Sequence, residues 1–193
     1  MPAILVSWYA GGEGGHALTD VLLGTVDASG RLPYSIPTTE AHLPFFDRNA
    51  TAITYDLWHG QRLLDRDGHT AAYPLGFGLS YTSFSIDTID ITDRDDENLT
   101  LTVRVSNNGD RTGRHVVQVY GCIDADDFPS RVLLGFAPVS LEAGASEQVT
   151  VRASLRPLQR WTPNGFVAAA PTVLLEASAY SGDSDAATAS FTL

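Results

Sequence analysis

The sequence lacks several features that define whole classes of protein. Its 193 residues include no lysine and only one cysteine. That cysteine, Cys122, excludes a disulfide within the chain and a cysteine-rich metal site. No apolar run reaches the roughly 20 residues of a membrane-spanning helix, and no basic flank of a signal peptide precedes the apolar start at Ala3. We therefore expect a cytoplasmic protein that is neither anchored in a membrane nor exported.

The charge is one-sided, and every basic residue is an arginine. Twelve arginines face 23 acidic residues, which gives a formal net charge of −11. This charge repels the phosphate backbone that dominates nucleic-acid binding, so we expect no nucleic-acid partner. Aspartate clusters such as 93–97 and 124–127 are typical of a halophilic surface, whose self-repulsion high salt relieves. A GC-rich genome that favours arginine codons is the alternative explanation. Neither cluster has the ligand spacing of a calcium loop.

The first part of the chain has the pattern of an incomplete α/β domain. The nearly unbroken apolar run Ala3 to Tyr9 predicts a strand buried on both faces. After a glycine-rich turn, His16 to Leu23 has helical spacing, and Gly24 suits the left-handed position that ends a helix. Two prolines restrict 31–37 to a sheet edge or an extended crossing, and the pattern then stays irregular to about Asp67. One strand and one helix are too few to make such a sheet, so most of that domain is missing.

The second part is predicted to be all-β, because apolar and polar residues alternate from about residue 85 onward. About six or seven short strands in a hundred residues are typical of an immunoglobulin-like or fibronectin type III-like sandwich. The fold class is therefore mixed, with a partial α/β sandwich segment over 1–85 and an all-β sandwich over 86–193. The clearest expected strands lie at 99–105, 117–119, 133–141, 149–155, 172–180 and 188–193.

The glycine loop invites a nucleotide-binding interpretation that the rest of the sequence does not favour. Gly12, Gly14 and Ala17 satisfy G-x-G-x-x-A between a predicted strand and a helix. A complete βαβ unit is missing, however, and Glu13 would repel a phosphate. The glycines are better explained by close backbone approach, with Glu13 placed favourably near a helix N-terminus. We expect no cofactor.

A search for hydrolytic chemistry finds no convincing site. No Gly-x-Ser-x-Gly elbow makes Ser7 or another serine a nucleophile, and Cys122 fits a buried small residue better than a reactive thiol. We therefore assign no catalytic, cofactor-binding or metal-binding residue. The histidines lack the close pairing of a zinc site and are expected at surface or packing positions: His16, His42, His59, His69 and His115.

Aromatic side chains are the remaining candidates for a carbohydrate-binding surface. They could stack on sugar rings, although packing between the two parts of the chain is the commoner use. Two glycosylation sequons, at Asn49 and Asn98, carry no weight without export. The aromatic candidates are Trp8, Trp58, Trp161, Phe45, Phe46, Tyr73, Phe77 and Tyr81.

A set of motifs follows in a fixed order along the chain: 8–15, 17–24, 29–33 and 73–82 in the first part, and 103–113, 116–120, 134–136 and 141–144 in the second. Together these motifs resemble the C-terminal region of glycoside hydrolase family 3, the β-glucosidases and β-xylosidases. The resemblance covers nearly the whole chain, with a departure at 129–133, where the family usually has a basic, proline-containing approach to its Leu-x-Gly-Phe motif. It implies the end of the family's α/β sandwich domain followed by its fibronectin type III-like domain.

The resemblance also implies that the catalytic groups lie outside this sequence. The family's aspartate nucleophile belongs to a barrel domain, and its acid/base glutamate lies upstream of the motif that begins at Trp8. Glu13 matches a glutamate of the loop-helix motif, not the acid/base residue. Retaining hydrolysis needs two carboxyl groups about 5 Å apart, so this chain alone is expected to be inactive.

Two hypotheses remain, and they differ in the class of partner. In the first, the chain is a C-terminal fragment or split subunit of a family 3 β-glycosidase, and residues 1–85 pair with an upstream glycosidase polypeptide or self-associate. In the second, it is an independent β-sandwich module that binds carbohydrate or protein. An upstream reading frame that encodes a barrel would favour the first hypothesis, and an unrelated neighbour would favour the second.

Overall fold

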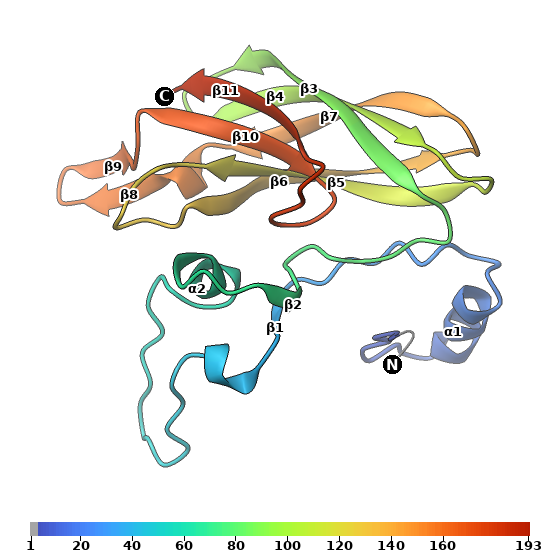
Figure 1. Cartoon of the computed structure of the whole chain (residues 1–193), viewed down its shortest axis with the longest axis horizontal. Helices are drawn as coiled ribbons and strands as arrows, with labels where there is room; N and C mark the ends of the chain where they lie inside the picture. The colour runs from blue at the N-terminus through green and yellow to red at the C-terminus, as the bar shows by residue number, and fades with distance from the viewer. Residues whose placement is uncertain (1–3) are drawn as a thin grey trace.

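The structure, a computed structural model, describes residues 4–193 and contains one β-sandwich with a long N-terminal extension. Residues 84–193 form the sandwich, and residues 4–82, here called the arm, run along one side of it (Figure 1). Among the described residues, no helix has the length and apolar character needed to cross a membrane.

Two antiparallel sheets make up the sandwich, as the alternating sequence predicts. One sheet has the order β3-β4-β7, with β3 (Phe84–Arg94), β4 (Asn98–Asn107) and β7 (Ser146–Ser154). The other has the order β11-β10-β5-β6, with β5 (Gly113–Cys122), β6 (Arg131–Leu141), β10 (Thr172–Ser178) and β11 (Ala187–Thr192). The fold class is the expected one, a fibronectin type III-like sandwich that follows a mixed segment.

The hydrophobic core lies between these two sheets. Its composition follows from the alternation of apolar and polar residues along each strand. Successive side chains of a strand point to opposite faces, so every second residue of β4 points inward. Those residues are Leu99, Leu101, Val103 and Val105, and each is 0% exposed. Val173 and Leu175 of β10, also 0% exposed, belong to the same cluster. Burial of a side chain of this size stabilises a fold by about 1.5–3 kcal/mol relative to leaving it exposed.

One hairpin outside the two sheets was not among the predicted strands. After η2 (Arg156–Leu158), β8 (Gln159–Thr162) pairs with β9 (Gly165–Ala168) as a separate two-stranded sheet. This hairpin projects from the left end of the sandwich in Figure 1. Its strands are only 4 residues long and largely solvent-facing, so they carry little of the alternation that marks the core strands.

The arm has more regular structure than predicted. Helix α1 (Gly14–Leu22) begins two residues before the expected start, and Gly24 has the expected left-handed φ of 71°. The expected irregular region contains β1 (Ile36–Pro37), η1 (Glu40–His42) and α2 (Gln61–Arg66), and β1 pairs with β2 (Ala71–Tyr73). The short α2 was missed because Leu63 and Leu64 are buried by packing near β6, not by a long helical pattern.

The predicted buried strand from Ala3 to Tyr9 is wrong for the part that is described. Ala3 lies outside the described residues, and 4–9 form no strand. The side chains there are exposed, from 42% for Val6 to 105% for Tyr9. An extended segment becomes a buried strand only when neighbouring strands take its backbone hydrogen bonds, and no described strand lies beside it.

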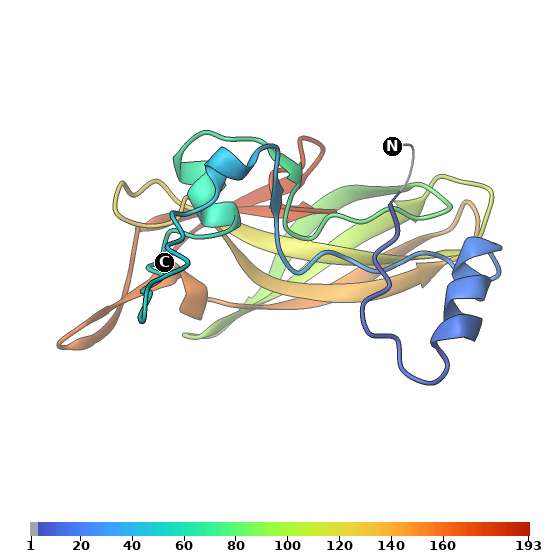
Figure 2. The ribbon, with the colours of Figure 1, turned by 90° about the horizontal axis from the view of Figure 1, so that it is seen from below.

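Tertiary contacts hold the arm against the outer face of the β11-β10-β5-β6 sheet. Seen from below, the arm crosses this sheet, with α1 at one end and α2 at the other (Figure 2). Gln118 and Tyr120 of β5 point to this outer face and are buried beneath the arm. The sandwich therefore fixes the path of the arm, while the far side of the arm stays open.

Candidate functional site

Asp27 joins the arm to the sandwich at the end where the arm crosses β5. Its carboxylate accepts hydrogen bonds from the backbone N–H of Tyr81 (2.8 Å), the backbone N–H of Arg114 (2.9 Å) and the Ser80 hydroxyl (2.8 Å). Partial burial acts to raise the pKa of Asp27, but these hydrogen bonds and nearby Arg31 hold it below its ordinary value. Asp27 is therefore an ionised connector, not an acid held ready to donate a proton.

A second set of contacts between the arm and the sandwich lies in the middle of the arm, where Gly76 crosses β5. Gln118 donates from Nε2 to the Gly76 carbonyl at 3.1 Å and accepts from the Tyr120 hydroxyl at 2.7 Å. Gly76 has a φ of 82°, and a Cβ there would overlap the Gln118 side chain. Burial, the main cause, raises the pKa of Tyr120, so its hydroxyl remains a donor. Position 76 therefore requires glycine, both for its left-handed backbone conformation and for the space that the Gln118 side chain occupies.

Charged side chains tie α2 to the sandwich at the third contact. Arg131 donates from Nε to Glu176 at 2.8 Å, and its Nη1 lies 3.6 Å from Asp65 Oδ2. Burial raises the pKa of Asp65, although hydrogen bonding by Gln61 and the charge of Arg131 oppose it. A cavity of about 570 Å³ lies beside this cluster, between the arm and the loop around Ser181. The polar residues that line this cavity include those that hold α2 against the sandwich.

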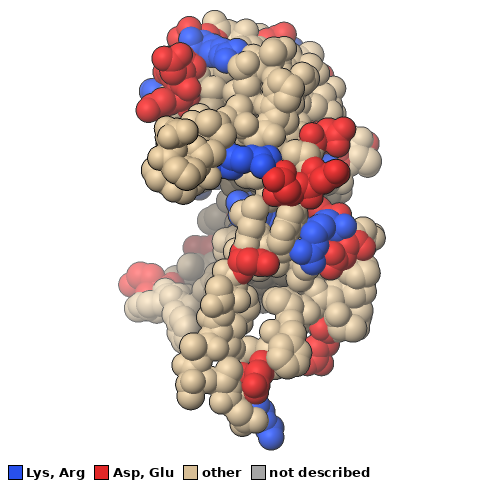
Figure 3. Space-filling model, turned by 90° about the vertical axis from the view of Figure 1, so that its left-hand side faces the viewer, with Lys and Arg blue, Asp and Glu red and all other residues tan. Residues whose placement is uncertain are grey.

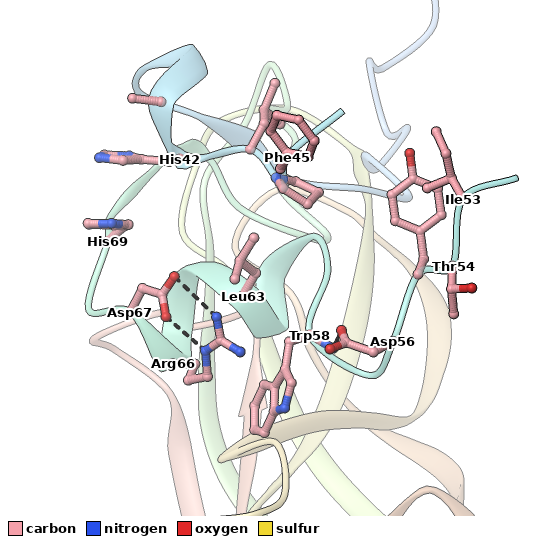
Figure 4. A pocket seen from close by; sticks show the side chains of 14 residues that line it. His42, Phe45, Ile53, Thr54, Asp56, Trp58, Leu63, Arg66, Asp67 and His69 are labelled. Atoms are coloured by element: carbon pink, nitrogen blue, oxygen red, sulfur yellow. Dashed lines mark hydrogen bonds and ion pairs between the residues drawn. The ribbon is translucent and has the colours of Figure 1, made fainter. Parts of the chain in front are cut away.

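A separate hollow of about 310 Å³ lies under the long loop of the arm, next to α2 (Figure 4). The rings of His42 and His69 stack there with centroids 3.6 Å apart. Arg66 lies over the Trp58 ring at 5.1 Å and donates from Nε to Asp67 at 2.8 Å. The two carboxylate oxygens of Asp67 are thus occupied by Arg66 in Figure 4. The hollow offers aromatic walls but no paired acid and base.

The arm exposes many large apolar side chains. Helix α1 has no buried residue. In the space-filling view, the lower half, which the arm forms, is mostly uncharged with isolated acidic and arginine side chains (Figure 3). Many large apolar side chains of the arm are exposed, and monomeric proteins rarely leave large apolar patches in water. Those exposed side chains include Ile4, Leu5, Val6, Trp8, Tyr9, Leu18, Leu22, Leu23, Val26, Tyr34, Leu43, Phe45, Phe46, Ile53, Tyr55 and Leu57.

The glycine loop forms the start of α1, without a nucleotide-site geometry around it. Gly14 is the first helical residue, and a Cβ there would come 2.6 Å from the Cβ of Ala10. Glu13 accepts a hydrogen bond from His16 at 2.9 Å, and both side chains are 89% exposed. The Ala10 side chain therefore leaves no room for a Cβ at Gly14, whereas a Cβ at Gly12 would meet no described atom within 4 Å, so the predicted close backbone approach is not seen at Gly12.

The histidines and the cysteine form no metal cluster among residues 4–193. His115 is 4% exposed, and burial, helped by Arg31, lowers its pKa to about 4. Burial also raises the pKa of Cys122 to about 12, which keeps the thiol protonated and unreactive. His16 and His59 lie in exposed parts of the arm, and His42 and His69 are the one pair of histidine rings that stack on each other among the described residues.

The aromatic candidates divide into packed and exposed groups. Phe77 contacts Tyr73 at 5.4 Å within the arm and Tyr180 of the sandwich at 5.7 Å, which confirms packing between the two parts. Trp161, by contrast, is 66% exposed on β8 and contacts Phe166 of β9.

The sequence analysis missed the polar residues that connect the arm to the sandwich: Asp27, Gln118 and the cluster around Arg131. Single polar residues have no periodic pattern in the sequence that could reveal such a role.

Two family profiles match separate parts of the chain. Residues 1–81 match the profile of the glycosyl hydrolase family 3 C-terminal domain, and residues 115–175 match that of the fibronectin type III-like domain. The chain belongs to glycoside hydrolase family 3. It matches the C-terminal region of that family, the end of the α/β domain followed by the fibronectin type III-like sandwich.

Relatives within family 3 are β-glucosidases that are much longer than this chain. The periplasmic beta-glucosidase of Salmonella typhimurium is 32% identical over 168 residues, which cover 82% of this chain and 22% of that protein. The beta-glucosidase of Kluyveromyces marxianus is 35% identical over 162 residues, covering 80% and 19%. The chain thus spans about a fifth of the length of these curated relatives.

Solved family 3 structures have the same fold in this region. The beta-D-glucoside glucohydrolase of Trichoderma reesei superimposes with a TM-score of 0.84 at 26% identity, covering 94% of this chain and 29% of that one. The Kluyveromyces marxianus beta-glucosidase in complex with glucose gives a TM-score of 0.82 at 31% identity, with 96% and 23% covered. The alignment therefore includes most of the arm as well as the sandwich.

Proposed function

We propose that this chain supports a family 3 β-glycosidase by completing the α/β domain, and that it carries no catalytic carboxylate of its own. The observation that carries the proposal is the apolar arm. Its residues follow the path seen in intact β-glucosidases, yet their apolar side chains are exposed. A surface of this kind is expected where another part of the same enzyme packs.

The partner is the remainder of a family 3 α/β domain with its barrel, supplied as the preceding part of a longer chain or as a separate polypeptide. The exposed segment 4–9 presents free backbone N–H and C=O groups together with apolar side chains, which suits pairing within a sheet. Without that partner, the same surface drives self-association. In this proposal the chain divides into an α/β part, residues 1–85, and a sandwich, residues 86–193.

Reconstitution of activity tests the proposal. A Kluyveromyces marxianus β-glucosidase that ends just before the matching region is mixed with the 193-residue chain, and hydrolysis of an aryl β-glucoside is followed. We expect neither polypeptide to turn over substrate alone and the mixture to be at least tenfold more active than the truncated enzyme. Size-exclusion chromatography of the same samples should show a mixed complex in place of self-association.

A matched pair of substitutions locates the contact. Val6→Asp puts a charge on the apolar surface of the arm, where the side chain is 42% exposed, and should abolish both reconstitution and self-association. Thr150→Asp puts the same charge on the exposed face of β7 and should change neither. If the isolated chain is monomeric, and the mixture stays inactive with the unsubstituted chain, the proposed supporting role is wrong.

A stand-alone β-sandwich module that binds carbohydrate or protein is the second candidate, favoured by the exposed aromatic hairpin of the sandwich. Carbohydrate binding without any reconstitution would favour it. The cytoplasmic location and the halophilic origin remain predictions from the sequence. Fractionation of the native cells would test the first, and salt-dependent unfolding would test the second.

A further inference from the structure

The β8–β9 hairpin is held rigidly at its base. Leu158, which immediately precedes β8, is 0% exposed, and the Ala169 N–H donates to its carbonyl at 2.9 Å. At the tip, the Thr162 hydroxyl donates to the Gly165 carbonyl at 2.8 Å, and Gly165 has a φ of 111°. The hairpin therefore presents its side chains from a fixed backbone.

One face of the hairpin is tied down by Arg160. Its guanidinium donates from Nη2 to Asp127 at 2.9 Å and to the Ala169 carbonyl at 3.3 Å, and it lies over the Phe128 ring at 5.8 Å. The neighbouring residue Trp161 must point to the opposite face, because successive side chains of a strand alternate. Anchoring one face thus leaves the other face directed toward solvent.

That second face carries two aromatic rings side by side. Trp161 pairs with Phe166 across the hairpin, and their ring centroids lie 4.7 Å apart at 58°. Trp161 is 66% exposed and Phe166 is 43% exposed. Arg156 lies over the face of the Phe166 ring and donates to Gln159 Oε1 at 3.3 Å, so the guanidinium covers part of that ring and Trp161 is the more exposed of the two rings.

We propose that this face, with Trp161 as the stacking ring and with Phe166, Arg156 and Gln159 beside it, binds β-linked oligosaccharides of gluco configuration. When all ring hydroxyls are equatorial, both faces of a pyranose present axial C–H groups, and such a face packs well on an exposed indole. The guanidinium and the amide can hydrogen-bond the hydroxyls around the rim. The proposal rests on the proposed function, because the ligand class follows from a chain that serves a β-glycosidase.

A protein partner fits this platform less well than a sugar chain. Each aromatic side chain buries about 150–250 Å² on contact, so two rings provide far less than the roughly 800 Å² per partner of a stable protein interface. The platform is suited to a ligand that makes a small contact repeatedly, such as one or two sugar units of a polysaccharide. Binding is expected to be weak, with a Kd of about 1 mM for a short oligosaccharide.

Native affinity electrophoresis of the full 193-residue chain tests the proposal. Gels contain hydroxyethyl cellulose or mixed-linkage β-glucan as the probe, and gels with dextran or without polysaccharide are the controls. We expect the β-glucans to retard the chain more strongly than dextran, whose glucose rings have the same axial C–H groups but are joined by α-linkages. Trp161→Ala should weaken the retardation at least tenfold, and Phe166→Ala should weaken it by a smaller factor.

Phe136→Ala is the control, since Phe136 is 64% exposed on β6 of the sandwich, outside both the hairpin and the apolar surface of the arm. Equal losses for Phe136→Ala and Trp161→Ala, or no retardation of the unsubstituted chain, would overturn the proposal. So would a Trp161→Ala chain that still binds β-glucan but fails to reconstitute activity, because the hairpin would then dock on protein. If the Trp161→Ala chain loses β-glucan binding but still reconstitutes activity, both proposals are supported. If the unsubstituted chain reconstitutes activity but does not bind β-glucan, only the proposed binding site on the hairpin is rejected.

Discussion

His115 shows how a single buried side chain makes this fold sensitive to acid. Its ring stacks on Phe84 with centroids 4.9 Å apart, and Nδ1 accepts a hydrogen bond from Arg31 at 3.2 Å. Arg31 can only donate, so the imidazole must be neutral at Nδ1. The single proton of the neutral ring is then on Nε2, which is buried without a hydrogen-bond partner in the described structure, and a second proton would have to go to Nδ1, against the positively charged Arg31.

The free energy of unfolding is therefore expected to fall as the pH falls from 7.5 to 5. Burial and Arg31 lower the pKa of His115 to about 4 from its ordinary 6.5, so the unfolded chain binds more protons between these values. The stability due to this shift is complete above pH 6.5 and is lost toward pH 4, by about 2 kcal/mol between pH 7.5 and 5. Urea unfolding at both pH values measures it.

His115→Gln serves as the control for this pH dependence. Glutamine keeps an acceptor for Arg31 but cannot take up a proton in this range. The variant should lose less stability than the unsubstituted chain over the same interval. Aspartates with lowered pKa values, such as Asp27, begin to titrate only below this window. Parallel pH profiles for the two proteins would contradict the assignment to His115.

Polar contacts hold the arm against the sandwich, and the arm has few buried apolar side chains of its own. Asp27→Ala should loosen it, because the N–H groups of Tyr81 and Arg114 lose their acceptor. Each orphaned backbone donor costs about 1–3 kcal/mol if it stays out of water. We expect faster hydrogen exchange at 24–37 and 76–82, with exchange in the core strands β4 and β10 unchanged.

Asp20→Ala, a substitution on α1 of the same charge and size, tests whether the effect is specific. The Asp20 carboxylate accepts no hydrogen bond among the described residues, so its removal should leave exchange in the arm unchanged. Equal exchange in both variants would mean that Asp27 does not hold the arm. An effect of Asp27→Ala that extends through β4 would mean that arm and sandwich unfold as one unit.

The whole molecule carries its net charge of −11 on a surface whose acidic clusters are exposed. Self-repulsion of this kind is weakened as the Debye length falls from about 10 Å at 0.1 M salt to about 3 Å at 1 M. We expect thermal unfolding to shift upward in 1 M potassium chloride by several degrees, since 1 kcal/mol corresponds to about 2–4 °C at this size.

A charge-neutralising variant separates screening from general salt effects. Replacing Asp96, Asp124 and Asp126 by asparagine should reduce the upward shift, because these exposed carboxylates lie in the two acidic clusters. Asp95 and Asp127 are left unchanged, since each accepts hydrogen bonds that hold the local backbone or Arg160. A melting temperature that does not rise with salt would remove the argument for a halophilic surface.

The sequence by itself determined the sandwich, because alternation is a local property. The residues that alternate in β4 become core residues whichever strands lie beside them. Gly24 was predictable for the same reason, since the left-handed turn after α1 depends only on its own backbone. The family resemblance also rests on local motifs such as 73–82, which can be identified and ordered from the sequence without knowing what they contact.

Only the tertiary structure decided where the arm lies and which of its side chains are covered. The run from Ala3 to Tyr9 has the composition of a buried strand, but burial needs neighbours, and the described residues supply none. Asp27, Gln118 and Arg131 became connectors because the chain brought together groups far apart in sequence. The exposed pair Trp161 and Phe166 likewise depends on a hairpin whose short strands carry little periodic signal, and on Arg160, which anchors its other face.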